Sequence, residues 1–358
     1  MTVKYGILSL VAVLSIAASG CSSIYDDLEP CPSGVDLKFV YDYNIDRADM
    51  FPDHVGAVTV YVFDEQGNYI SSKEELNTPE EKPLAEPLYS MHLDLEPGTY
   101  SFIALAHQRG YDECLANPGA KYRRSAMTPT RSTASDLTVT LDREGGVVKH
   151  AGMPLDTLWH GMSAEPLTVR DTEAASQTIS LMRDTKNLTI SLHNLDNPAD
   201  MDIDEFEIAI TNDNGKIGHD NTLLDDETLT YTPYALWNTS FATKGEEGDQ
   251  NDRLERTAHA ALAFNRIMHY PDAADNNRNA LLTITNRTTG KTVARINLPD
   301  CLAQGRGAFE YLHYSPQEFL DREHDYKLDF FIRGDKWQYA ELSISILSWS
   351  KRIQNLEF

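Results

Sequence analysis

The chain has few cysteines, few basic residues and no apolar run long enough to cross a bilayer. Its 358 residues include four cysteines, and 31 lysines and arginines stand against 55 aspartates and glutamates. The formal net charge is −24, and a surface of that sign repels the phosphates of nucleic acids and of anionic lipid headgroups. The composition therefore excludes a nucleic-acid partner and indicates an acidic, well-solvated surface.

The signatures of common catalytic and metal sites are also missing. The sequence has no G-x-S-x-G elbow, no glycine-rich phosphate loop, no H-E-x-x-H pair and no dinucleotide-binding fingerprint. The eleven histidines are scattered, and His107, His160 and His259 are expected to be structural or surface residues. We therefore expect no enzyme activity, no small-molecule substrate, no cofactor and no metal.

The first 20 residues have the pattern of a bacterial export signal. Lys4 precedes a mostly apolar stretch, residues 5–18, which is shorter than the roughly 20 residues that span a bilayer. Small residues then lead to Ala-Ser-Gly-Cys, which resembles a lipobox. This pattern predicts cleavage between Gly20 and Cys21 and acylation of Cys21, as an N-palmitoyl and S-diacylglycerol cysteine. The alternative is an ordinary signal peptide with Cys21 as a disulfide partner.

Acylation of Cys21 would leave three other cysteines: Cys31, Cys114 and Cys301. An odd number in an oxidising envelope predicts one disulfide and one free thiol. The spacings match no zinc pattern and do not choose among the three pairings. Residues 21–34, rich in acids and prolines, are expected to form a short lipidated tether.

Strand patterns begin directly after this tether. Period-two patterns occur in LKFVYDYN (37–44), VTVYVFDEQGNYI (58–70) and QTISLMRD (177–184). The second run puts its valines on one face and Tyr61 and Phe63 on the other, and then turns at Asp64-Glu65-Gln66-Gly67. MHLDLEPGTYSFIALA (91–106) predicts a hairpin with a type II turn at Pro97-Gly98. Residues 71–86 and 244–252 read as acidic surface loops. No stretch before residue 185 predicts an amphipathic helix.

A second set of strands follows the polar stretch RDTKN (183–187). LLTITNRTTGKTVARINL (281–298) predicts a hairpin around Thr289-Gly290, and Pro316 after Ser315 predicts a short helix. RTAHAALAFNRIM (256–268) fits either a helix or a strand. The whole pattern predicts an all-β protein of two antiparallel β-sandwiches in tandem, at 35–185 and 186–358. Four tryptophans are expected mainly in the core: Trp159, Trp237, Trp337 and Trp349.

Several of these stretches, taken in order, resemble the FimB family of fimbrial anchor subunits from Bacteroides-type bacteria. They include CSSIYDDLEPCPSGVDLKFVYDYN, LDLEPGTYSFIALA, LWHGM, DDETLTYTPY, QEFLDREHDYKLDFF and SWSKRIQNLEF. The resemblance covers nearly the whole chain from Cys21 to Phe358. It implies two transthyretin-like sandwiches of the fimbrillin type, and a lipoprotein held in the outer membrane through Cys21 and exposed at the cell surface.

The family also implies a partner and a mechanism. Stalk subunits of such fimbriae join by adding a strand of one subunit to the sheet edge of the next, so that main-chain hydrogen bonds supply affinity. The first arginine, Arg47, lies beyond the first predicted strand at 36–44. This favours an uncut base subunit that anchors the fibre and limits its length. The alternative function is a surface lipoprotein that binds glycans, with Trp237 as a stacking residue.

Overall fold

The computed structural model describes residues 34–171, 174–243, 253–272, 276–307, 312–344 and 350–353. The predicted signal peptide, Cys21, Cys31, Trp349 and the predicted loop at 244–252 lie outside these ranges. Within them the chain is rich in strands and its helices are short, which confirms the all-β prediction. No helix in this part of the chain combines the length and the apolar character needed to cross a membrane.

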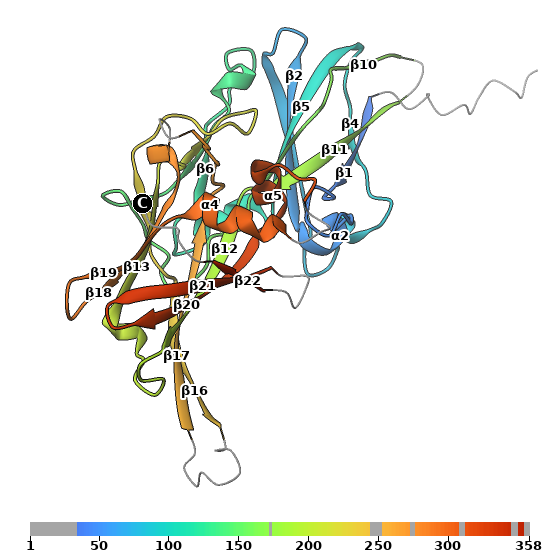
Figure 1. Ribbon diagram of the computed structural model, residues 1–358. Coiled ribbons are helices and arrows are strands. Elements are labelled where there is room, and N and C mark those ends of the chain that lie inside the picture. The colour runs from blue at the N-terminus through green and yellow to red at the C-terminus, as the bar shows by residue number, and fades with distance from the viewer. Residues whose placement is uncertain are drawn as a thin grey trace, which may run out of the picture.

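The N-terminal half forms an eight-stranded sheet in the order β3-β2-β5-β9-β11-β1-β4, with β10 paired to β5 (Figure 1). β11 changes partner along its length, because Ala175–Ser180 pair with β1 and Leu181–Arg183 with β9. The strands are β1 (Val35–Val40), β2 (Ala57–Asp64), β3 (Tyr69–Leu76), β4 (Met91–Leu93), β5 (Gly98–His107), β9 (Trp159–Met162), β10 (Leu167–Val169) and β11 (Ala175–Arg183).

Strand β2 is buried on both faces. Val58, Val60 and Val62 belong to the core of the N-terminal sheet, which also takes residues from β1, β4, β5 and β11. Tyr61 and Phe63, on the opposite face, belong to a larger core that continues into the C-terminal half. The alternation therefore predicted the two faces correctly, and β2 separates two apolar cores.

The hairpin between β2 and β3 forms as its turn residues predict. Gly67 has φ +79°, and the carboxylate Oδ1 of Asp64 accepts hydrogen bonds from the backbone N–H groups of Gln66 and Asn68. Strand β3 continues to Leu76. The prediction of a loop from residue 71 was therefore wrong for its first six residues, because their backbone groups pair with β2.

The predicted hairpin at 91–106 does not form. β4 pairs with β1, whereas β5 pairs with β2, β9 and β10. Gly98 is the first residue of β5, and it is not among the glycines with positive φ, so the type II turn is absent. Met91 and Leu93 are buried in the N-terminal core, and this long-range packing separates two strands that are adjacent in the sequence.

Two sheets make up the C-terminal half. One has the order β16-β17-β12-β20-β21-β22 and the other β19-β18-β13-β15-β8. Their strands are β12 (Lys186–Asn194), β13 (Phe206–Asn212), β15 (Leu229–Tyr231), β16 (Ala235–Thr243), β17 (Arg253–Phe264), β18 (Leu281–Asn286), β19 (Thr292–Asn297), β20 (Asp325–Arg333), β21 (Lys336–Ile344) and β22 (Ser350–Ile353). The ambiguous run at 256–268 is thus largely strand, and the hairpin at Gly290 is confirmed.

Strand pairing crosses the boundary expected between residues 185 and 186. Three short strands precede it: β6 (Tyr122–Arg124), β7 (Val139–Leu141) and β8 (Val147–Val148). β7 pairs with β14 (Lys216–Ile217), and β8 runs parallel to β15 and completes the five-stranded sheet. The pairs β1–β11 and β12–β20 are also parallel, and the other ladders are antiparallel.

The helices are short and lie between strands. They are α2 (Phe51–His54), α3 (Tyr111–Ala116), α4 (Leu298–Ala303) and α5 (Pro316–Arg322), with 3-10 turns at Pro83–Ala85, Ala134–Asp136, Ile203–Glu205, Asn276–Arg278 and Gln304–Gly307. α5 begins where the sequence predicts, because the Ser315 hydroxyl accepts a hydrogen bond from the N–H of Glu318. Figure 1 places α4 and α5 between the two halves.

Candidate functional site

Of the four cysteines predicted as site residues, the structure describes Cys114 and Cys301. Cys21 and Cys31, with the cleavage position after Gly20, lie outside the described residues. Cys114 in α3 and Cys301 in α4 are free and buried, so the pairing of these two is not formed. Burial raises the pKa of each thiol to about 12, which keeps it protonated and unreactive. Pairings that involve Cys31 stay predictions.

The direct connection between β11 and β12 is a deeply buried polar segment. Asp184 and Thr185 are completely buried, and Lys186 is 1% exposed. The sequence RDTKN reads as a polar linker, but it lacks the glycine, proline and serine that make linkers flexible. That absence argues against a flexible linker, but the burial itself is set by segments far away in the chain.

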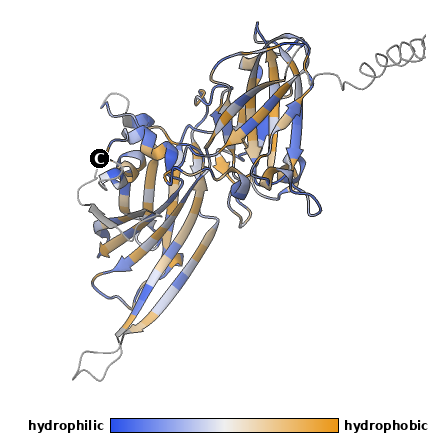
Figure 2. Cartoon of the chain, turned by 90° about the vertical axis from the view of Figure 1, so that its right-hand side faces the viewer, coloured by the Kyte–Doolittle hydropathy of each residue, from blue (hydrophilic) through white to orange (hydrophobic). Residues whose placement is uncertain are grey.

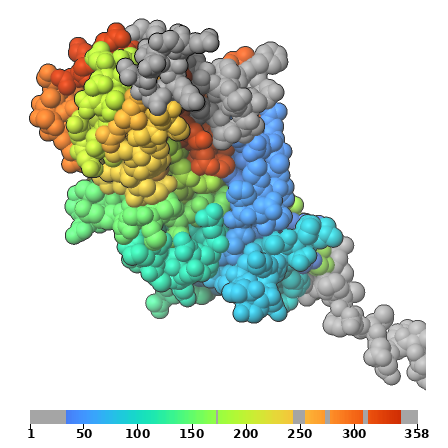
Figure 3. Space-filling view, turned by 90° about the horizontal axis from the view of Figure 1, so that it is seen from below, coloured from blue at the N-terminus to red at the C-terminus, as the bar shows by residue number. Residues whose placement is uncertain are grey.

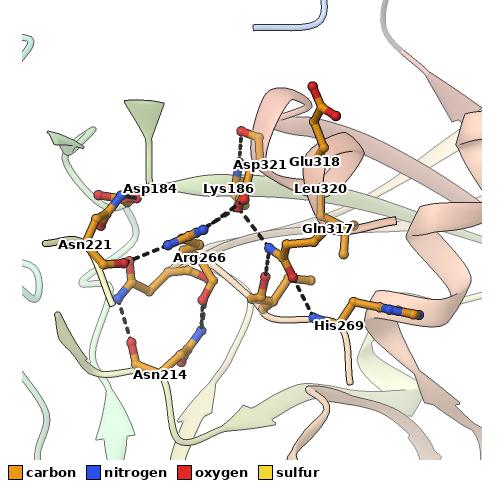
Figure 4. A network of polar contacts seen from close by, with 12 residues as sticks. Asp184, Lys186, Asn214, Asn221, Arg266, His269, Gln317, Glu318, Leu320 and Asp321 are labelled. Atoms are coloured by element: carbon orange, nitrogen blue, oxygen red, sulfur yellow. Dashed lines mark hydrogen bonds and ion pairs between the residues drawn. The ribbon is translucent and has the colours of Figure 1, made fainter. Parts of the chain in front are cut away.

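Lys186 fastens this connection to the end of α5. Its ammonium Nζ donates a hydrogen bond of 2.9 Å to the backbone carbonyl of Asp321 (Figure 4) and another of 2.9 Å to that of Glu323. Burial lowers the pKa of Lys186 to about 8. Two carbonyl acceptors thus replace water around the buried ammonium group.

Arg266 joins three segments at the same place. Its guanidinium donates from Nε and Nη2 to the two carboxylate oxygens of Asp321, at 2.7 and 2.8 Å, and from Nη1 to the carbonyl of Asn221 at 2.7 Å. The amide of Asn221 donates to Asp184 at 3.1 Å. Burial raises the pKa of Asp184 to about 6, against the opposing effect of Arg266. We call Asp184, Lys186, Asn221, Arg266 and Asp321 the buried joint.

A second set of contacts ties the loop after β1 to α5. The Arg322 guanidinium lies over the rings of Tyr43 and Tyr314, at 4.1 and 4.9 Å from their centroids. Arg47 donates from Nε to the hydroxyl of Tyr314 at 2.6 Å. Such cation–π contacts contribute roughly 0.5–2 kcal/mol each. The start of the N-terminal sheet is therefore held to the C-terminal half independently of the buried joint.

The tryptophans do not all lie in the core as predicted. Trp159 and Trp337 are buried, but Trp237 is 39% exposed. The prediction was wrong for Trp237 because its strand, β16, lies at the edge of the six-stranded sheet, where alternation does not imply a covering layer. His107 and His160 are buried and His259 is half-buried, each hydrogen-bonded within the protein.

The buried joint holds segments together that are distant in the sequence. Among the described residues, no cluster of three or more histidine, cysteine or acidic side chains has the geometry to hold a metal ion. Arg266 pairs with Asp321, Lys186 donates to backbone carbonyls, and Asp184 accepts from the amide of Asn221. The last of these bonds joins the end of the N-terminal half to the C-terminal half.

Comparisons with known proteins agree with this picture. Residues 28–355 match the model of a family described as the fimbrillin-A associated anchor proteins Mfa1 and Mfa2. The minor fimbrium anchoring subunit Mfa2 of Porphyromonas gingivalis is 22% identical over 307 residues, which cover 83% of this chain and 81% of that protein. Its solved structure, 16% identical, superposes with a TM-score of 0.61 over 88% of this chain and 98% of that one, which shows the fold.

Two solved structures from Bacteroides thetaiotaomicron are more similar. One, described as a candidate polysaccharide-binding protein, is 30% identical with a TM-score of 0.70, covering 90% of this chain and 99% of that one. The other, described as a candidate adhesin, is 28% identical with a TM-score of 0.73, covering 92% of this chain and 100% of that one. The shared fold therefore extends over both halves of the chain.

Proposed function

Since this chain belongs to the family of fimbrillin-A associated anchor proteins, we propose that it is the base subunit of a fimbria, held in the outer membrane by fatty acids on Cys21. The observation that carries the proposal is the family match over residues 28–355, which spans both halves of the protein. The base subunit would hold the fibre to the cell surface and limit its length, without catalysing a reaction.

The fold suits a subunit that works under tension. The Asn221–Asp184 hydrogen bond of the buried joint and the contact of Arg322 with Tyr43 connect the halves through side chains, and two ladders connect them through the backbone. The twelve residues between Cys21 and Gly34 let the two Cα atoms lie at most about 45 Å apart. An acylated Cys21 would therefore keep the body close to the membrane, since two acyl chains anchor a protein stably.

The start of the chain supports an uncut subunit. β1 pairs with β11 and β4, and no arginine lies between Cys21 and the end of β1. Cleavage at Arg47, the first arginine, would remove β1 from the N-terminal sheet. We expect the intact mass of the envelope-purified protein to correspond to a chain that begins at Cys21; a chain beginning at Ala48 would contradict the proposal.

Metabolic labelling tests the lipid anchor. Labelled palmitate should enter the protein, and Cys21→Ala should abolish both the label and sedimentation with outer membranes. Cys31→Ala is the matched control, because it removes the next thiol in the same segment and should change neither result. Deletion of the protein should release fimbriae into the medium. Fimbriae that stay on the cell after deletion would refute the anchor function.

A second candidate function, glycan binding, is favoured by the exposure of Trp237. An exposed indole is a frequent stacking surface for sugar rings. Electrophoresis in gels that contain polysaccharide tests this function. Retardation that disappears in Trp237→Ala would support it, and mobility equal to that in plain gels would exclude it for the polysaccharides used.

A further inference from the structure

The edge strand β16 lacks most of the features that protect an edge against pairing with another chain, apart from the hydrogen bonds of the Asn238 side chain with Asp202 and Ile203. Its nine residues, ALWNTSFAT, include no charged residue, no proline and no glycine. All nine pair with β17 in a continuous register without a bulge. β17 is its one strand partner in the part of the chain that the structure describes. Alternate backbone N–H and C=O groups along its other side are therefore available to a further strand.

Two other edge strands, β3 and β19, carry the usual protective features. β3 presents Lys73, Glu74 and Glu75 and has a register shift beside Phe63. β19 contains Arg295 and has a register shift at Thr285. Charges and bulges at edges discourage association between sheets. The contrast indicates that the open edge of β16 is retained for a partner.

The apolar side chains of this hairpin are unusually exposed. Phe241 is 65% exposed, Leu254 48% and Leu236 46%. In Figure 1 the β16–β17 pair extends below the body of the molecule, and its surface faces the viewer in Figure 3. In the register of the hairpin, Trp237 and Phe241 share one face, whereas Leu236 and Leu254 lie on the other. The face with Trp237 and Phe241 is the candidate interaction surface.

The stacking of Trp237 indicates where a side chain of an added strand would lie. Trp237 stacks on His259 of the neighbouring strand, with centroids 5.0 Å apart and planes inclined by 14°. His259 is fixed by hydrogen bonds with Ser191 at 3.1 Å and Thr239 at 2.8 Å. The spacing matches the distance between adjacent strands. The second face of the indole therefore lies where the side chain of an added strand would stack.

The position of β16 suits a joint with a fibre. The described chain starts at the end of the N-terminal sheet, and Figures 1 and 2 place the β16–β17 hairpin at the opposite end of the molecule. If a lipid holds the first end to the membrane, the second end points away from it. This inference rests on the proposed anchor function.

We propose that β16 is the docking edge for an extended strand of a fimbrial subunit, which pairs with its backbone and packs side chains on Trp237 and Phe241. A second copy of this chain is a poorer occupant, because two bodies of charge −24 repel each other. A sugar would use only the open face of the Trp237 ring, whereas a strand would also use the backbone edge of β16.

Amide hydrogen exchange of the unmodified, full-length mature protein tests the proposal directly. Fimbriae sheared from the same cells are the probe. Their addition should slow exchange of amides in Ala235–Thr243 by about tenfold or more, as expected when open donors become paired. Exchange in Ser71–Leu76 of β3, the control edge, should not change. Binding that protects other segments and leaves β16 unchanged would overturn the proposal.

Charged variants provide the second arm. Trp237→Lys and Phe241→Lys should each weaken binding of sheared fimbriae by about tenfold, equivalent to 1.4 kcal/mol. Leu76→Lys on β3, where Leu76 is 38% exposed, is the matched control and should bind normally. Circular dichroism should be unchanged in all three, since these side chains are exposed. Normal binding by both β16 variants would overturn the proposal.

The outcomes separate this inference from the anchor function. If cells that carry a β16 variant keep their fimbriae, whereas cells that lack the protein lose them, the protein is an anchor that uses another edge. A dimer of the purified protein that Phe241→Lys dissociates would identify a second copy as occupant and overturn the proposal. If cells with either β16 variant lose their fimbriae while the variant protein still incorporates labelled palmitate, the docking edge and the anchor function are both supported.

Discussion

At the scale of single residues, a buried ion pair fixes how the segments around α5 are arranged. Arg266 and Asp321 form a bidentate pair in a site from which water is largely excluded. Such a pair adds little net stability compared with apolar residues, but removing one partner leaves the other charge buried and unpaired. The same two residues also hold α5 and the Asn221 segment together. The pair therefore acts mainly by fixing the positions of these two segments.

Arg266→Met should destabilise the protein by roughly 3–5 kcal/mol, because Asp321 would be left buried without its cation. Denaturant unfolding monitored by tryptophan fluorescence measures the change. The control is Arg123→Met, which breaks an exposed pair with Asp142 and should cost less than about 1 kcal/mol. Equal losses of stability in the two variants would show that burial of Asp321 does not depend on its pairing with Arg266.

Buried histidines predict sensitivity to acid. Burial lowers the pKa of His107 to about 3 and that of His160 to about 4. In the unfolded chain both bind protons below about pH 6.5. The unfolded state then holds more protons than the folded state, so stability falls as the pH decreases from about 6.5 towards 4. Each residue contributes a slope of up to about 1.4 kcal/mol per pH unit.

His107→Gln should remove one such slope while keeping a donor for the carbonyl of Thr157, which lies 2.9 Å from Nδ1 of His107. Denaturant titrations at pH 7, 6 and 5 compare the variant with the unmodified protein. His92→Gln is the control, because hydrogen bonding to Asp36 raises the pKa of His92 and gives a dependence of opposite sign. An unchanged slope in His107→Gln would contradict the assignment.

At the scale of elements, close packing of strands decides which small residues are required. Gly161 in β9 lies against β11, and a Cβ atom there would come within 2.7 Å of the carbonyl oxygen of Ser180 and 2.8 Å of the side chain of Ile179. The backbone carbonyl belongs to the ladder and has little freedom to move. The glycine thus allows β11 to pass from β1 to β9.

Gly161→Ala should therefore destabilise the protein by about 1–3 kcal/mol, the usual cost of forcing extra volume into a packed region. Thermal and denaturant unfolding measure it. Gly110→Ala is the control: its Cβ would meet Leu76 at an ordinary 3.7 Å, so we expect only a few tenths of a kcal/mol. A neutral Gly161→Ala would show that β9 and β11 can separate without cost.

At the scale of the whole molecule, the two halves share a core. One buried cluster includes Tyr61 and Leu105 of the N-terminal sheet, Val139 of β7, and Ile190 and Phe330 of the C-terminal sheet. The ladders β7–β14 and β8–β15 cross the same boundary. Separation of the halves would expose this cluster and break both ladders, so the halves are not independent.

Calorimetry should therefore show one cooperative transition in the mature protein, with equal calorimetric and van't Hoff enthalpies. Two resolved transitions would indicate halves that unfold separately, as linked but independent domains would. As an internal comparison, Val148→Asp, which places a charge in the shared core at the β8–β15 ladder, should lower the midpoint of the entire transition. A shift of only one part would contradict the shared core.

The sequence by itself determined what depends on near neighbours. Period-two alternation identified most strands and both faces of β2, Gly67 and Gly290 marked turns, and Ser315-Pro316 marked the start of α5. The ordered stretches also indicated the anchor family, and hence an all-β fold.

Only the tertiary structure decided which strands pair and which surfaces are covered. It placed β4 beside β1 instead of β5, buried RDTKN, left Trp237 exposed and joined β8 to β15. The physical reason is that alternation specifies the two faces of a strand but neither its neighbours nor the layer above it. Those are set by contacts between residues far apart in the chain, which no local pattern records.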